Sequence, residues 1–141
     1  MTNTSSLPDV HLDVRAAIAA GQEPLDAILE AAAPLTGGGI LELTAPFNPV
    51  PLYSVMQDRG FSARTEQRGP AEWVVRFRGT GIVQASLLAE VADRHPATRP
   101  IMARHGLDMC CGGGKSVALA AAAHGLDVRA LLTELQEAVG D

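Results

Sequence analysis

The hydrophobic pattern of the chain changes at Gly79-Thr80-Gly81, and this change limits the folds that the chain can adopt. Before it, apolar and polar side chains alternate over residues 61–66 and 73–78, on either side of a Gly69-Pro70 turn. Alternation with a period of two predicts two matching half-exposed strands. After residue 81 we find no convincing strand, and apolar residues recur at helical spacing. The pattern therefore predicts a sheet-containing part followed by an all-helical part.

Two more strands and two helices are predicted before this hairpin. Residues 11–15 and 40–43 have strand patterns, whereas residues 16–21 fit neither pattern. Pro24 stands where a first helical turn accepts proline, and Pro34 stops that helix. A second helix carries Leu52, Tyr53 and Met56 on one face and ends at Gly60. The order β-α-β-α-β-β predicts an α+β fold in which two helices cover one face of a mixed sheet.

The second part is predicted to contain four helices. Their signals lie near residues 87–91, at 98–105 before Gly106, at 117–123 before Gly125, and at 128–139 with Asp127 as N-cap. We assign residues 1–79 to an α/β-sandwich domain and residues 80–141 to a helical domain. A unit of roughly sixty residues has a marginal core. We therefore expect the helical domain to be stabilised by packing against the first domain or against a second copy of itself.

Composition excludes several classes of protein. The chain has 141 residues, 47% hydrophobic residues and a formal net charge of -5. Its densest basic group is Arg64, Arg68, Arg76 and Arg78, which is no basic stripe with interleaved aromatic residues, so we expect no nucleic-acid partner. No apolar run approaches membrane-spanning length, and the start of the chain lacks a secretory pattern. We expect a soluble cytoplasmic protein.

The two cysteines of the chain, Cys110 and Cys111, are adjacent and precede three glycines, Gly112 to Gly114. In a reducing compartment such a pair indicates a metal, redox or sulfur site, whereas two packed apolar cysteines are the alternative. The apolar run at residues 117–123 places the pair at the start of a helix, where free N–H groups stabilise a thiolate. His105 and Lys115 add positive charge nearby.

The cysteine pair supplies too few ligands for a metal centre of its own. Two neighbouring thiolates do not easily chelate one tetrahedral metal ion. His105 is the best additional ligand, although a residue at a helix C-terminus also interacts with free carbonyl groups. Dimerisation would bring together four thiolates, which suit zinc or an iron-sulfur cluster. We therefore expect a homodimer formed through the helical domain.

The other candidate ligands have simpler roles in the sequence. His124 precedes Gly125 and is expected to cap its helix, and His95 precedes Pro96 at a helix break. His11 opens a strand with nothing around it to suggest chemistry. Asp108 fits an N-cap or turn role at least as well as metal binding.

The second part resembles the N-terminal domain of the iron-centre repair proteins of the ScdA/YtfE type, which are associated with nitrosative and oxidative stress. The resemblance covers residues 88–136 and centres on the Asp-x-Cys-Cys-Gly-Gly signature at residues 108–113. Proteins of that kind carry a hemerythrin-like di-iron domain after this one. This chain ends at Asp141, so the resemblance implies no self-contained di-iron site in it. We expect a hemerythrin-like di-iron protein or an iron-sulfur protein as a partner.

The first part resembles a family of small uncharacterised domains with the TusA-like sulfur-carrier fold. The resemblance rests on Leu12-Asp13-Val14-Arg15, the Glu-Pro helix start, Leu41-Glu42-Leu43 and the strand Trp73-Val74-Val75-Arg76. The sulfur carriers place a cysteine before the proline that opens the first helix. Here that position is Glu23, which departs from the carrier pattern.

We expect an accessory protein of iron-centre or iron-sulfur cluster repair under nitric oxide or related stress. The metal ligands would be Cys110, Cys111 and His105, and the cofactor, iron or an iron-sulfur cluster, would also lie against Gly112 and Gly113. No catalytic residue is assigned beyond the redox-reactive cysteines, so the pattern favours a protein that is not an enzyme. A persulfide carrier and a dimerisation or interaction module are the alternatives.

Overall fold

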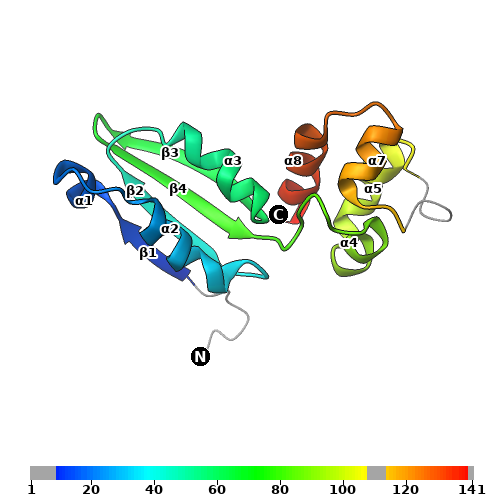
Figure 1. Cartoon of the computed structure of the whole chain (residues 1–141), viewed down its shortest axis with the longest axis horizontal. Helices are drawn as coiled ribbons and strands as arrows, with labels where there is room; N and C mark the ends of the chain where they lie inside the picture. The colour runs from blue at the N-terminus through cyan, green and yellow to red at the C-terminus, as the bar shows by residue number, and fades with distance from the viewer. Residues whose placement is uncertain (1–8, 108–113, 140–141) are drawn as a thin grey trace.

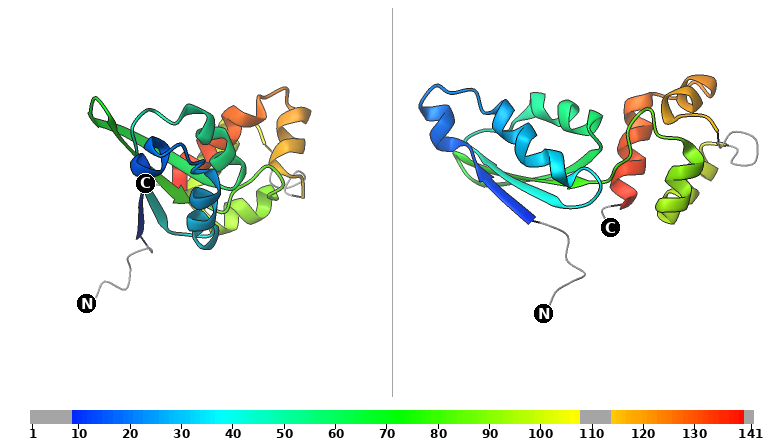
Figure 2. Two further views of the ribbon diagram at one scale, coloured as in Figure 1. Left: turned by 60° about the vertical axis from the view of Figure 1, so that its left-hand side comes forward. Right: turned by 60° about the horizontal axis from the view of Figure 1, so that its bottom comes forward.

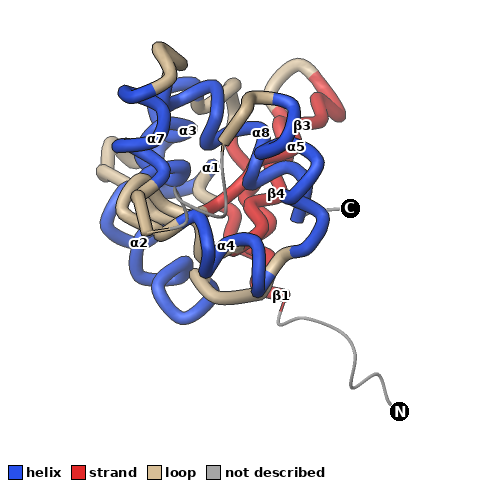
Figure 3. The backbone as a smooth tube through the Cα atoms, turned by 90° about the vertical axis from the view of Figure 1, so that its right-hand side faces the viewer, coloured by secondary structure: helices blue, strands red, loops and turns tan. Residues whose placement is uncertain are grey.

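The computed structural model describes residues 9–107 and 114–139 of the chain. Residues 9–79, called the N-terminal half below, form a sheet with helices, and residues 80–107 and 114–139, the C-terminal half, are mainly helical (Figure 1). The α+β class predicted from the sequence is confirmed. In the end-on view of Figure 3, the helices of the C-terminal half lie in front of the sheet. In the described residues, no helix is long and apolar enough to cross a membrane.

The sheet has four strands in the spatial order β1-β2-β4-β3. β1 and β2 are parallel, whereas β4 runs antiparallel to both of its neighbours, so the sheet is mixed as predicted. The strands are β1 (Asp9–Asp13), β2 (Ile40–Ala45), β3 (Phe61–Gly69) and β4 (Glu72–Gly79).

Three helices cover one face of this sheet (Figure 1). They are α1 (Arg15–Ala19), α2 (Leu25–Ala32), which continues into the short 3-10 helix η1 (Ala33–Leu35), and α3 (Val50–Asp58). Helices α2 and α3 are the two that the sequence predicts. Helix α1 occupies the residues whose pattern was ambiguous, and the first strand accordingly ends at Asp13 instead of residue 15.

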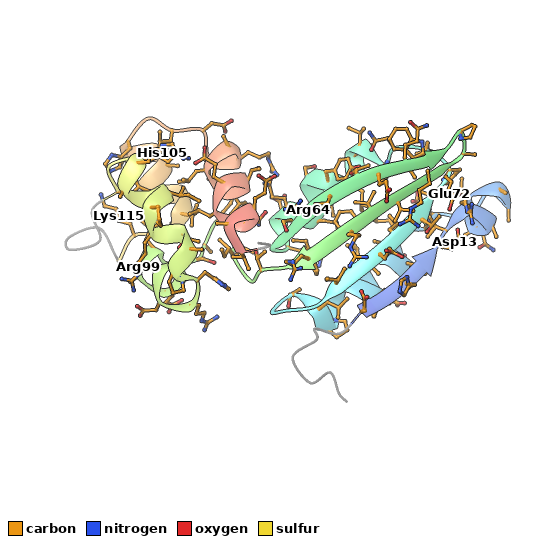
Figure 4. The ribbon with its side chains drawn as sticks, turned by 180° about the vertical axis from the view of Figure 1, so that it is seen from behind. Asp13, Arg64, Glu72, Arg99, His105 and Lys115 are labelled. Atoms are coloured by element: carbon orange, nitrogen blue, oxygen red, sulfur yellow. The ribbon has the colours of Figure 1, made fainter. Side chains whose placement is uncertain are left out.

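The core of the N-terminal half lies between this sheet face and the helices. Alternate residues of β2 and β4, among them Leu43, Val75 and Phe77, are fully buried because they point toward the helices. Ile28 of α2 and Met56 of α3 meet them from the helical side. The opposite sheet face carries polar side chains and is not covered by helices (Figure 4).

Gly79 marks the junction at which the hydrophobic pattern changes. A Cβ atom at this position would overlap the carbonyl oxygen of Leu35, so the end of β4 can approach η1 only because residue 79 is glycine. Thr80 follows and is buried, and its Oγ1 donates to the carbonyl of Gly60 at 2.6 Å and accepts from the amide of Ile82 at 3.1 Å. The junction is therefore fixed to the first half.

The C-terminal half packs its helices around a separate core. These elements are α4 (Leu88–Arg94), the 3-10 helix η2 (Pro96–Thr98), α5 (Arg99–Arg104), α7 (Val117–Ala123) and α8 (Val128–Val139). Met102, Val117 and Leu132 are among its fully buried residues. Asp127 caps α8 as predicted, because its Oδ1 accepts from the amide of Arg129 at 3.2 Å.

Helix α8 lies beside the end of α3 and connects the two halves (Figure 2). Gln136 is buried, and its amide nitrogen donates to the carbonyls of Gln57 at 3.0 Å and Ile82 at 2.7 Å. Arg129 donates to the side chains of Gln57 at 2.8 Å and Asp58 at 3.1 Å. The C-terminal half thus packs against the N-terminal half, which is one of the two kinds of stabilising contact expected from the sequence.

Candidate metal centre

The residues predicted to form the centre fall into two groups. The first group lies outside the described residues, so its predicted roles stay predictions; it comprises Asp108, Cys110, Cys111, Gly112 and Gly113. His105, Lys115 and both ends of the segment that contains the cysteines are described. The described residues on either side of the cysteine segment, with the helices α5 and α7 that hold them, are called the frame.

The chain leaves this frame at the end of α5. His105 is the C-cap residue, and Gly106 follows with φ +71°, a conformation that favours glycine and ends the helix. The amide of Leu107 donates back to the carbonyl of Met102 at 2.9 Å. The Leu107 side chain is buried in the core of the C-terminal half. The departure point is therefore fixed by packing and by backbone hydrogen bonds.

The chain returns to the frame at Lys115. Its carbonyl accepts from the amide of Leu88 at 3.0 Å, and the amide of Val117 donates to the carbonyl of Ser86 at 2.9 Å. Ser116 is the N-cap of α7, because its Oγ accepts from the amide of Leu119 at 3.1 Å. A serine thus caps the helix that the sequence predicted after the cysteines.

His105 is held by an ion-pair cluster. Its Nε2 lies 2.7 Å from Oε1 of Glu134, and the guanidinium of Arg104 donates to the same oxygen at 2.7 Å. The hydrogen bond with His105 is the largest influence on the pKa of Glu134 and lowers it; burial opposes this, and Arg104 lowers it further. The carboxylate of Glu134 therefore stays ionised at a lower pH than an ordinary glutamate would, and it holds His105 in place.

This contact bears on one of the two roles that the sequence gave His105, the interaction with free helix carbonyls, and the ligand role stays a prediction. The residue does end α5, yet its imidazole bonds to a carboxylate on α8 and not to a free helix carbonyl. With Nε2 bonded to Glu134, the nitrogen that remains for a metal ion is Nδ1. A carboxylate behind a ligating histidine is the usual second partner of such ligands, because it fixes the tautomer and the ring orientation.

Sequence reasoning did not find Glu134. It lies 29 residues after His105, on the polar side of α8. The apolar spacing of that helix predicted the helix itself but no partner for its polar residues. No local motif joins these positions, and only the packing of α5 against α8 brings them together. Lys115, predicted to add positive charge, is exposed, and Figure 4 shows it with His105 in the half of the molecule away from the sheet.

The remaining histidines lie elsewhere. His124 is the C-cap residue of α7 and His95 separates α4 from η2, so both predictions are confirmed. His11, for which no chemistry was expected, pairs its Nδ1 with Oε1 of Glu42 at 2.7 Å on the open sheet face. Within residues 9–107 and 114–139, no group of three or more His, Cys, Asp or Glu side chains could hold a metal ion.

Two known families match consecutive parts of the chain. Residues 11–79 match the family described as "Uncharacterized conserved protein (DUF2249)", and residues 84–139 match ScdA_N, described as "Domain of Unknown function (DUF542)". Searches of curated proteins and of solved structures found no match. The two family matches occur in the predicted order, which confirms the fusion expected from the sequence. The chain therefore joins a DUF2249 region to an ScdA_N region.

Proposed function

We propose that this protein is an accessory factor of iron-centre repair in which Cys110 and Cys111 bind iron or an iron-sulfur cluster. The ScdA_N match supports a role in iron-centre repair or the stress response in general. The observation that carries the finer proposal is the His105–Glu134 pair at the point where the chain enters the cysteine segment. A histidine ordered by a carboxylate, together with the two thiols that follow it closely in the sequence, is a donor set suited to iron.

The number of donors supports a dimer. Cys110, Cys111 and His105 supply three donors, whereas the tetrahedral iron or zinc sites and cubane clusters of proteins need four or more. Two copies of the chain would supply four thiolates. The centre would then lie between the C-terminal halves of two chains, with a hemerythrin-like di-iron protein or an iron-sulfur protein as the recipient of the repair.

A redox role for the same cysteines also follows from their spacing. A disulfide between neighbouring residues closes a strained ring and is readily reduced, so it suits a switch better than a structural link. On loss of iron, an oxidant would take two electrons from the two thiolates and leave a disulfide, which a cellular thiol can reduce to the two thiols that bind iron again.

The test is to purify the full chain without oxygen and to measure iron, sulfide and oligomeric mass on the same sample. We expect iron in the wild type, none in Cys110→Ser with Cys111→Ser, and less in His105→Asn. His124→Asn is the matched control because His124 is exposed and caps α7, so it should retain the wild-type iron content. A wild type without iron and without a reconstitutable cluster would overturn the proposal.

Two outcomes would assign a different function. A gain of sulfur mass on Cys110 or Cys111 after incubation with a sulfur donor, without iron, would identify a persulfide carrier. Slow and equal alkylation of both thiols in the native protein would identify packed cysteines in an interaction module. Both measurements use the same preparation, so they distinguish the three functions directly.

A further inference from the structure

An apolar pocket opens on the helical face of the N-terminal half. It has a volume of about 380 Å³ and lies between α1, α2 and α3 above the sheet. Ile18 of α1, Ile28 of α2 and Val55 of α3 line its sides, and Leu43 of β2 forms part of its floor. The pocket is far in sequence from the cysteine segment and has no part in the function proposed above.

The rim of the pocket carries an exposed aromatic ring. Phe47 lines the pocket, yet 50% of its surface is exposed, and Val50, two residues from the lining residue Leu52, is 60% exposed. The two are among the few large exposed hydrophobic residues of the described chain. Large aromatic side chains at the edge of an apolar depression are typical anchors of protein interfaces.

Glu23 is the only charged residue among those that line the pocket, and the nearby Arg15 is paired with Asp13. Between Arg15 and Arg59 the sequence contains no lysine, arginine or histidine. Glu23 lines the pocket, and Asp26 and Glu30 follow it on the exposed side of α2. None of these three carboxylates forms an ion pair with another residue that the structure describes. The pocket is thus an apolar surface with an unneutralised acidic border.

We propose that this pocket is the docking site for an amphipathic, basic helix of another protein. The apolar face of the helix would fill the space between α2 and α3 and pack on Phe47, while its lysine or arginine residues would face Glu23, Asp26 and Glu30. This is the helix-in-groove mode of recognition, in which apolar anchors give affinity and border charges give orientation and association rate.

Charge and lining chemistry favour this occupant over two others. A second copy of the chain, with a net charge of -5, would bring further negative charge to an acidic surface. Binding sites for small molecules place a few converging polar groups inside the pocket. Here the polar lining residues, Gln22 and Glu23, are exposed at the border and do not converge within it.

The test uses a fluorescent peptide of about 15 residues, roughly four helical turns, with leucine on one face and lysine on the other. Binding to the full chain is measured by anisotropy, and the bound position by amide NMR shifts. We expect shifts confined to α1, α2, α3 and the loop that holds Phe47. Phe47→Ser should weaken binding about tenfold, as for an aromatic anchor, and Glu23→Lys about threefold, as for a border charge.

Matched controls lie in the other half of the molecule. Leu119→Ser removes a leucine of α7 that is 62% exposed, and Glu90→Lys reverses an exposed charge on α4. Both should leave the affinity unchanged. Equal weakening by the controls, shifts outside the pocket, or equal binding of a leucine-glutamate peptide would overturn the proposal.

The alternative occupants give distinct results, and either would overturn the proposal. Self-association that Phe47→Ser abolishes would assign the pocket to a second copy of the chain. Binding of the neutral dye N-phenyl-1-naphthylamine that the basic peptide fails to displace would assign it to a small apolar molecule.

Discussion

Two glutamates in different halves of the molecule each hold one histidine and one arginine, but they do so differently. Glu42 bonds to His11 through Oε1 and to Arg76 through Oε2, both at 2.7 Å. Glu134 receives both of its partners on Oε1, and its Oε2 accepts no hydrogen bond from the described residues. Each oxygen of Glu42 thus has a partner, whereas Oε2 of Glu134 has none among the described residues.

The two carboxylates also differ in what sets their pKa. Burial is the largest influence on Glu42 and raises its pKa, but Arg76 and His11 together outweigh it, so the pKa is lowered. At Glu134 the hydrogen bond with His105 is itself the largest influence. The Glu42 side chain is 15% exposed and that of Glu134 is 37% exposed. The comparison indicates a structural role for Glu42 and a positioning role for Glu134.

The largest expected effect is on metal affinity. Glu134→Gln removes the charge behind His105, and loss of such a second partner lowers metal affinity about 10- to 100-fold. Glu42→Gln makes the same change on the sheet and should leave iron affinity unchanged. Titration of iron into the anaerobic protein measures both. Equal loss in the two variants would mean that stability, and not the positioning of His105, decides the iron content.

The second effect is on the free energy of unfolding, and here Glu42→Gln should have the larger effect of the two variants. Glu42→Gln weakens two charge-assisted hydrogen bonds at a largely buried carboxylate and should cost about 1–2 kcal/mol in the free energy of unfolding. Glu134→Gln should cost about 0.5 kcal/mol, because solvent screens a carboxylate that is more than a third exposed. Urea denaturation of the two variants measures the difference. A larger cost at Glu134 would contradict the structural role assigned to Glu42.

Sequence reasoning could have reached the Glu42 cluster, because strand register fixes it. His11, Glu42, Arg76 and Arg64 are directly opposite one another across the four strands. Once the strands are paired, alternation places these side chains on the same face. The strands and most helices were predicted from the same periodicities, since apolar spacing and the Gly and Pro signals are local.

The Glu134 cluster and the contact between the halves could not be found in this way. Both depend on how α8 packs against other helices, and a polar side chain on a helix surface carries no signal about its partner. Gln136 is an example: it is buried and donates to the carbonyls of Gln57 and Ile82. In the sequence, nothing distinguishes it from an exposed glutamine near the end of a helix.

The third prediction concerns acid. A carboxylate whose pKa is lowered on folding contributes stability above its unfolded pKa, about 4.3, and loses that contribution as the pH falls through the folded pKa. The stability difference between wild type and Glu42→Gln should therefore be full above the unfolded pKa of about 4.3 and shrink as the pH falls through the lowered pKa of Glu42 in the folded protein. Thermal unfolding at several pH values measures it. A difference that grows in acid would contradict the lowered pKa.

The smallest expected effect comes from the arginines. Arg76 donates to Glu42 through Nη1 and Arg104 donates to Glu134 through Nη2, each to a single oxygen. Because neither contact uses the paired geometry that only a guanidinium provides, lysine can replace either residue at a cost within about 0.5 kcal/mol. Urea denaturation of Arg76→Lys and Arg104→Lys measures this cost. A loss of several times that size at Arg76 alone would show that its guanidinium makes a further contact on the sheet, and would strengthen the contrast between Glu42, with a partner on each oxygen, and Glu134.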